Sequence, residues 1–100
     1  MPQKVIELAI KALKKFGVEA QMRMVQEEAA ELIAAISHSL RGRGKEEELL
    51  EEFVDMDIVF TQMAIIISKI YEAEKIDAMY EAKLSRLKTL LGSGSRRPEK

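Results

Sequence analysis

The chain has 100 residues, of which 47% are hydrophobic and 33% are charged, and its formal net charge is -1. This composition indicates a folded protein of one domain and excludes a disordered chain. Because the net charge is close to zero, no overall field favours a nucleic-acid polymer or an anionic membrane as a partner. The chain contains no cysteine, which excludes disulfides, zinc–thiolate sites and thiol catalysis.

Two helices are predicted in the first half of the chain. Apolar side chains recur every three or four residues over residues 2–16, where we expect the first helix, and Gly17 provides its stop. The same periodicity predicts a second helix over residues 18–40. Gly42 and Gly44 interrupt the pattern there, so we expect a polar loop to follow.

The second half of the chain predicts two further helices and a tail. The third helix is expected from about residue 45 to residue 70, and its charged side chains exclude a membrane span. The fourth is expected over about residues 72–91, where an apolar stripe recurs. No Gly or Pro separates these two helices, so one continuous or kinked helix is an open alternative. Residues 92–100 are rich in Gly and Ser and predict a flexible tail.

These elements together predict an all-α fold, an antiparallel bundle of about four helices within residues 1–91. The consecutive isoleucines at 65–67 point around most of the helix circumference, and four short helices cover them poorly. We therefore expect a homodimer or homotetramer to complete the bundle. The first residues have no signal-peptide pattern, so a cytoplasmic protein is expected.

Two pairs of acidic residues stand out within the apolar helical patterns. Glu28 and Glu31 form one pair, and Glu52 and Asp55 form the other. The spacing of i and i+3 puts both acids of a pair on one helix face. If the second and third helices pack antiparallel, the four acids face each other. Four carboxylates in a partly buried space are costly without a positive charge between them, and a hard cation such as Mg²⁺ prefers oxygen ligands.

The residues around these pairs resemble the MazG family, the all-α nucleoside triphosphate pyrophosphohydrolases. The likeness is carried by residues 20–36, AQMRMVQEEAAELIAAI, and residues 51–58, EEFVDMDI. The family motif is Glu-x-x-Glu, a spacer of variable length, and Glu-x-x-Asp. The resemblance covers about residues 16–90 and is greatest to the short single-domain members.

The resemblance implies Mg²⁺-dependent cleavage of a nucleoside triphosphate between the α and β phosphates, with Mn²⁺ as a substitute cofactor. The products would be a monophosphate and pyrophosphate, and a deoxyribonucleotide is the expected substrate. By position, Glu28, Glu31, Glu52 and Asp55 would be the metal ligands and catalytic residues. One acid not fully engaged by metal can accept a proton from the attacking water, and we expect Glu31 or Glu28 to do so.

Further residues are candidates for substrate contact. Lys83 and Arg86 share a face of the fourth helix, and similar proteins contact phosphate with a Lys and an Arg on the last helix. Gln21 lies two turns before the first acid pair, where relatives often have a Gln, so a base contact is expected. The basic loop 41–45 either closes over a substrate or is only solvated. His38 is expected to be a surface residue.

Two other classes of function compete with this interpretation. A di-iron carboxylate bundle uses Glu-x-x-His pairs, and the single histidine, His38, does not have that spacing. A non-catalytic helical module for oligomerisation or interaction is the stronger alternative, with the acids paired to lysines across a subunit interface. Stabilisation by a divalent metal distinguishes the two classes, because only a specific site responds.

Overall fold

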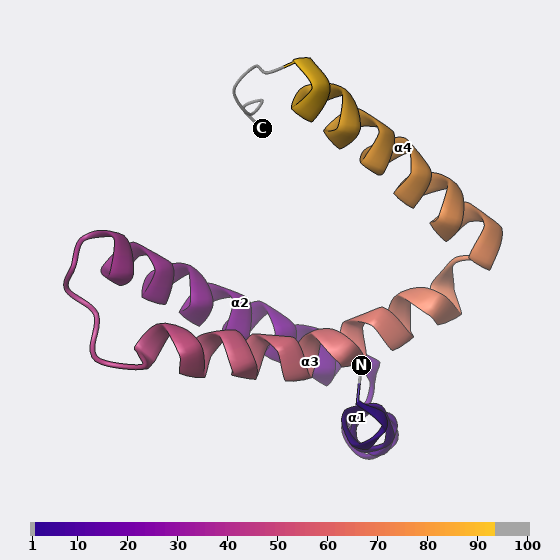
Figure 1. Ribbon diagram of the computed structural model, residues 1–100. Coiled ribbons are helices and arrows are strands. Elements are labelled where there is room, and N and C mark those ends of the chain that lie inside the picture. The colour runs from indigo at the N-terminus through magenta and orange to yellow at the C-terminus, as the bar shows by residue number, and fades with distance from the viewer. Residues whose placement is uncertain (1, 94–100) are drawn as a thin grey trace. The chain divides into compact units, whose positions relative to one another are not determined.

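The computed structural model describes residues 2–93, and these residues form four helices and no strand (Figure 1). The predicted all-α fold is confirmed. The chain divides between Ile67 and Ser68 into two compact units, which are described separately. The helices are α1 (Gln3–Phe16), α2 (Val18–Leu40), α3 (Glu48–Ile70) and α4 (Ala73–Ser93).

The first two helices lie within one residue of their expected bounds, whereas α3 begins at Glu48 and not near residue 45. The delay has a local cause. The Glu48 N–H donates to the Lys45 carbonyl at 3.1 Å, and Glu47 has a φ of 68°, so the chain makes a tight turn before the helix. At the other end, residues 92 and 93 continue α4, and residues 94–100 of the expected tail lie outside the described residues.

The first unit contains α1, α2 and most of α3. Figure 1 shows α2 and α3 running side by side in opposite directions from a loop that joins them. Gly17 connects α1 to α2 with a φ of 90°, a conformation that glycine adopts at little cost, and the two helices contact each other. The buried apolar side chains come from all three helices and are few and mostly small: Ala9, Ala35, Val59 and Ile66.

A polar contact holds α2 and α3 in register. Gln21 and Gln62 are each only 7% exposed, and the Gln21 Nε2 donates to the Gln62 Oε1 at 2.6 Å. A buried amide costs free energy unless its polar atoms are paired, so this bond disfavours any sliding of one helix along the other. Thr61 is also buried, and its hydroxyl donates to the Asp57 carbonyl one turn earlier.

Large apolar side chains remain on the surface of the first unit. Ile33 is 67% exposed on α2, and Phe53 is 57% exposed on α3. The isoleucines at 65–67, by contrast, are buried or half-buried within the unit. These exposed apolar side chains are the surface that a partner chain would cover.

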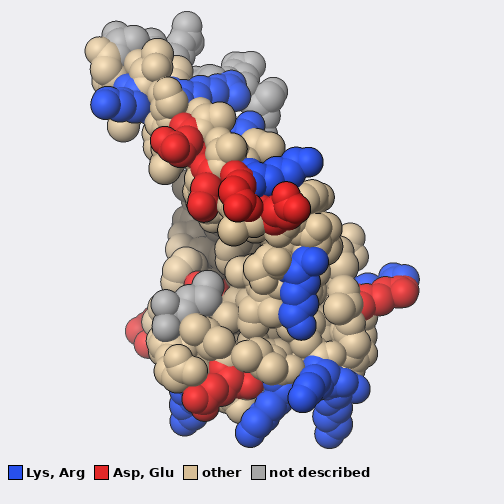
Figure 2. Space-filling model, turned by 90° about the vertical axis from the view of Figure 1, so that its right-hand side faces the viewer, with Lys and Arg blue, Asp and Glu red and all other residues tan. Residues whose placement is uncertain are grey.

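Charged side chains form separate groups on the face drawn in Figure 2, with uncharged surface between them. Between residues 2 and 93, none of the helices combines the length and apolar character that crossing a membrane requires.

Candidate metal centre

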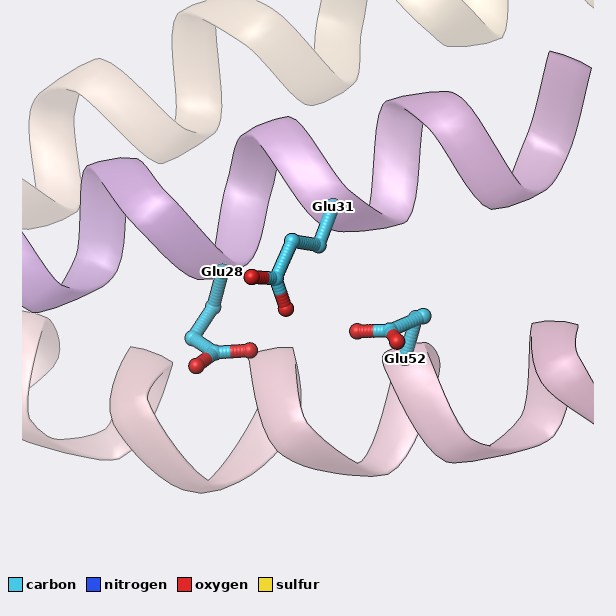
Figure 3. Close-up of side chains that lie close together, drawn as sticks. All are labelled: Glu28, Glu31 and Glu52. Carbon is cyan, nitrogen blue, oxygen red and sulfur yellow. The ribbon is translucent and has the colours of Figure 1, made fainter.

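Three of the four predicted acids converge between α2 and α3. The two glutamates of α2, Glu28 and Glu31, lie one turn apart and face α3, from which Glu52 points back toward them (Figure 3). One carboxylate oxygen of each residue lies within 4.8 Å of those of the other two. The antiparallel packing thus produces the juxtaposition that the i and i+3 spacing predicts.

Two oxygens of this cluster are buried without a hydrogen-bond partner. Glu28 and Glu52 are half-buried, while Glu31 is exposed. The Oε1 atoms of Glu28 and Glu52 are inaccessible to solvent, and neither accepts a hydrogen bond from a described residue. Burying a carboxylate oxygen unpaired costs free energy, and an acceptor-only cluster needs a donor or a cation. An all-oxygen set with orphaned buried atoms therefore fits a hard divalent cation.

The electrostatics of the cluster point the same way. Burial raises the pKa of the Glu28 carboxyl above its ordinary value of 4.5, and the charges of Glu31 and Asp55 raise it further. Burial likewise raises the pKa of Glu52, and the approach of Glu31 adds to the rise. Both shifts arise because the ionised forms are poorly solvated and repel one another. A cation between them would offset both effects, because its charge favours the ionised carboxylates.

Asp55, the fourth predicted ligand, lies beside the three glutamates but outside their 4.8 Å group. Its charge raises the pKa of both Glu28 and Glu52, so it belongs to the same electrostatic cluster. The register explains its place. Gln21 bonds to Gln62, and seven residues, two helical turns, separate Gln21 from Glu28 and Asp55 from Gln62. Glu28 is therefore level with Asp55 across the pair of helices.

The other predicted site residues have different surroundings. Gln21 is buried and its amide donates to Gln62, a contact that sequence reasoning missed. The sequence did contain a sign of this contact, because Gln62 is an uncharged polar residue within the most apolar stretch of the chain. Lys83 and Arg86 lie three residues apart on α4, both exposed, in the second unit. Substrate contact by these three residues stays a prediction.

A second polar cluster, also missed from the sequence, lies at the loop end of the hairpin. His38 is exposed, as expected, but its Nδ1 lies 3.0 Å from the Oε2 of Glu48. The backbone N–H of Lys45 donates to the Oε1 of the same carboxylate at 3.2 Å. The hydrogen bond with His38 lowers the pKa of Glu48, and the Lys45 N–H contributes to the shift. Glu48 therefore ties the end of α2 to the loop and to the first turn of α3.

Comparisons with known proteins do not identify a relative. No protein-family model, no curated protein and no solved structure matches the chain. Membership of the MazG family therefore stays a prediction that rests on the two acidic motifs. What the cluster can do must be inferred from its own chemistry, that of three converging carboxylates with a fourth beside them.

Proposed function

We propose that the chain is a Mg²⁺-dependent nucleoside triphosphate pyrophosphohydrolase of the MazG type. It would cleave the triphosphate between the α and β phosphates, with deoxyribonucleotides as the preferred class. One observation carries the proposal: Glu28, Glu31 and Glu52 converge within 4.8 Å, and two of their oxygens are buried and unpaired. Substrates rich in negative charge approach such a cluster only when a cation lies between.

Glu28, Glu31 and Glu52 would hold the cation, with Asp55 completing the set from the same helix as Glu52. A bound Mg²⁺ or Mn²⁺ supplies Lewis-acid polarisation of phosphate oxygens and lowers the pKa of a bound water. The ionised carboxylates can only accept hydrogen bonds, so they attract cations and the O–H groups of water. They repel a phosphate whose charge no cation screens.

In the proposed reaction, the oxygen of a water molecule bonds to the α phosphorus, and the bond from this phosphorus to the bridging oxygen breaks. Pyrophosphate leaves with that oxygen. The proton released by the water passes to a carboxylate of the cluster, and we assign this role to Glu31 or Glu28. Glu31 is the more exposed of the two and so the more accessible to an entering water.

Basic side chains would bind the phosphates. We propose that Lys83 and Arg86, which share an exposed face of α4, contribute to this binding. An arginine presents a planar fork of donors that suits phosphate oxygens, and a lysine adds a compact charge. Lys83→Ala should weaken triphosphate binding. Unchanged steady-state constants in this variant would assign the residue to solvent contact only.

We also propose that the active form is a homodimer or homotetramer. The exposed Ile33 on α2 and Phe53 on α3 support this, because large apolar side chains lose their contact with water when a second copy covers them. Sedimentation velocity of the whole chain tests it. A single monomeric species at micromolar concentration would contradict the proposal.

The experiment that tests the function is product analysis for a panel of ribo- and deoxyribonucleoside triphosphates, with Mg²⁺, with Mn²⁺ and with chelator. The proposal expects metal-dependent release of pyrophosphate and a matching monophosphate. A non-catalytic helical module would give no turnover and no rise in melting temperature with metal. Release of inorganic phosphate would keep a metal-dependent hydrolase but move the site of cleavage.

A further inference from the structure

The loop between α2 and α3 lines an open depression of about 440 Å³ whose walls are mostly basic. We call it the loop pocket. Its lining consists of His38, Arg41, Arg43, Lys45 and Glu48. Three of these residues carry a permanent positive charge and one carries a negative charge, so the pocket has an excess of cations, unlike the carboxylate cluster.

The backbone that carries these cations is held by hydrogen bonds at the end of α2. The Arg43 N–H donates to the His38 carbonyl at 2.9 Å, and the Gly42 N–H donates to the Ser39 carbonyl at 3.0 Å. With Gly42 at a φ of 68°, this is the bond pattern of a Schellman cap. Arg41 and Arg43 therefore leave the backbone from fixed positions on either side of this glycine.

The single acid of the loop pocket is already engaged. Glu48 receives the Lys45 N–H on one oxygen and contacts the His38 ring on the other. The side chains of Arg41, Arg43 and Lys45, in contrast, form no ion pair with any residue between 2 and 93. A group of unpaired cations on this loop, two of them arginines that donate through a planar fork, is suited to a phosphate-bearing anion.

The loop pocket lies on the same seam of the hairpin as the carboxylates. His38 follows Glu31 by seven residues, about 10 Å or two turns along α2, and so occupies the same helix face. Glu48 precedes Glu52 by four residues, about 6 Å along α3, also on one face. Both sites belong to the first unit, so their separation is set by the hairpin itself.

We propose that the loop pocket binds the terminal phosphates of the nucleoside triphosphate whose cleaved phosphate is held at the carboxylate cluster. The proposal rests on the proposed function and extends it, because the pocket would select for a triphosphate over a monophosphate. Arg41 and Arg43 would contact the phosphate oxygens, and Lys45 would add positive charge. Glu48 would hold the loop, with both of its oxygens engaged by His38 and the Lys45 N–H.

The test uses the double variant Arg41→Gln/Arg43→Gln, which leaves the backbone bonds of the cap in place. Its matched control is Lys11→Gln/Lys14→Gln, which removes two exposed charges from α1. Binding of inorganic tripolyphosphate to the metal-free whole chain is measured by calorimetry, and KM and kcat for a triphosphate are measured with Mg²⁺. Melting temperatures of all three proteins report folding, and Lys45→Gln provides a second variant if the double variant does not fold.

We expect the loop variant to bind tripolyphosphate at least about tenfold more weakly and to raise KM more than it lowers kcat, with the control unchanged. Equal tripolyphosphate affinity in wild type, loop variant and control would overturn the proposal that the loop pocket binds phosphate. Weaker binding with an unchanged KM would mean that the pocket takes free phosphate and would overturn its assignment to the substrate. Wild-type binding of tripolyphosphate without any triphosphate turnover would refute the hydrolase, and with it the assignment to substrate, while supporting the anion site.

Discussion

The charge repulsion between the carboxylates gives a prediction that needs no knowledge of the substrate. Replacing Glu28 by Gln keeps the shape of the side chain and removes one negative charge from the cluster. In the metal-free protein, the substitution replaces a carboxylate that has a buried, unpaired oxygen by an uncharged amide. The side chain at position 28 is then no longer repelled by the charges of Glu31 and Asp55. We expect Glu28→Gln to stabilise the metal-free fold and to weaken its stabilisation by Mg²⁺.

The size of the effect follows from the separation of the charges. At the 4.8 Å limit between the oxygens of Glu28 and Glu31, the repulsion is about 1 kcal/mol in water and roughly 3 kcal/mol at an effective dielectric constant of 20. Glu31 is exposed, so solvent screens the pair and the lower figure applies. For a domain of this size, about 1 kcal/mol corresponds to a rise of roughly 4–8 °C in melting temperature.

The pH dependence has a definite sign. Because the pKa of Glu28 is raised above 4.5 in the fold, the folded protein holds more protons than the unfolded chain between 4.5 and the raised value. The stability of the metal-free protein should therefore rise as the pH falls from neutral through the raised pKa, and level off below about 4.5. Glu28→Gln should flatten this rise. The pKa of Glu48 is lowered in the fold, so protonation of Glu48 reduces the stability only once the pH falls below its ordinary pKa of 4.5.

Thermal melts of the metal-free proteins from neutral pH down to about pH 4, with and without Mg²⁺, provide the measurement. Glu81→Gln is the matched control, since Glu81 is an exposed glutamate of α4 whose charge does not contribute to the pKa shift of Glu28. Equal melting temperatures for the two variants at neutral pH, or a lower one for Glu28→Gln than for wild type, would refute the electrostatic account of the cluster.

Three further predictions concern single side chains. Asp55→Asn should abolish metal-dependent triphosphate hydrolysis while the exposed Asp57→Asn keeps it, and full activity of the former in a steady-state assay would remove Asp55 from the site. Gln62→Ala should lower the free energy of unfolding by about 1–3 kcal/mol in urea titrations, because the buried amide of Gln21 loses its acceptor; wild-type stability would show that the bond contributes nothing. Glu47→Gly should raise the stability by up to about 1 kcal/mol, because it removes a non-glycine residue from φ 68°, and an unchanged urea midpoint would count against strain there.

The first two helices, and the shared face of the two acids in each pair, were predictable because each depends on local periodicity; the meeting of acids from α2 and α3 depended in addition on the expected antiparallel packing. Apolar spacing places α1 and α2, and the i and i+3 acids must share a face once a helix forms. The start of α3 was not predictable in the same way. Acids such as Glu46 and Glu47 are typical of a first helical turn, yet the chain uses them in a tight turn whose φ of 68° no local preference of Glu indicates.

Contacts between residues far apart in the sequence were the other part that the sequence did not reveal. The bond from Gln21 to Gln62 requires the register of two helices to be known, and many registers satisfy the same apolar stripes. The contact of His38 with Glu48 depends in addition on the conformation of a loop with two glycines. Chain periodicity fixes which face a residue occupies, whereas pairing across helices is decided by packing and by the loop.

The two contacts that sequence reasoning missed account for how the acids stay together without a cation. The Gln21–Gln62 bond lies two turns from the cluster on one side, and the His38–Glu48 contact lies on the loop side. Each links α2 to α3, so repulsion among the carboxylates cannot separate the helices without breaking a polar link at either end. The hairpin therefore holds its acids in position without a cation, and binding of a cation would not have to order the backbone. A site built in this way should respond to metal with a higher melting temperature and an unchanged helix content.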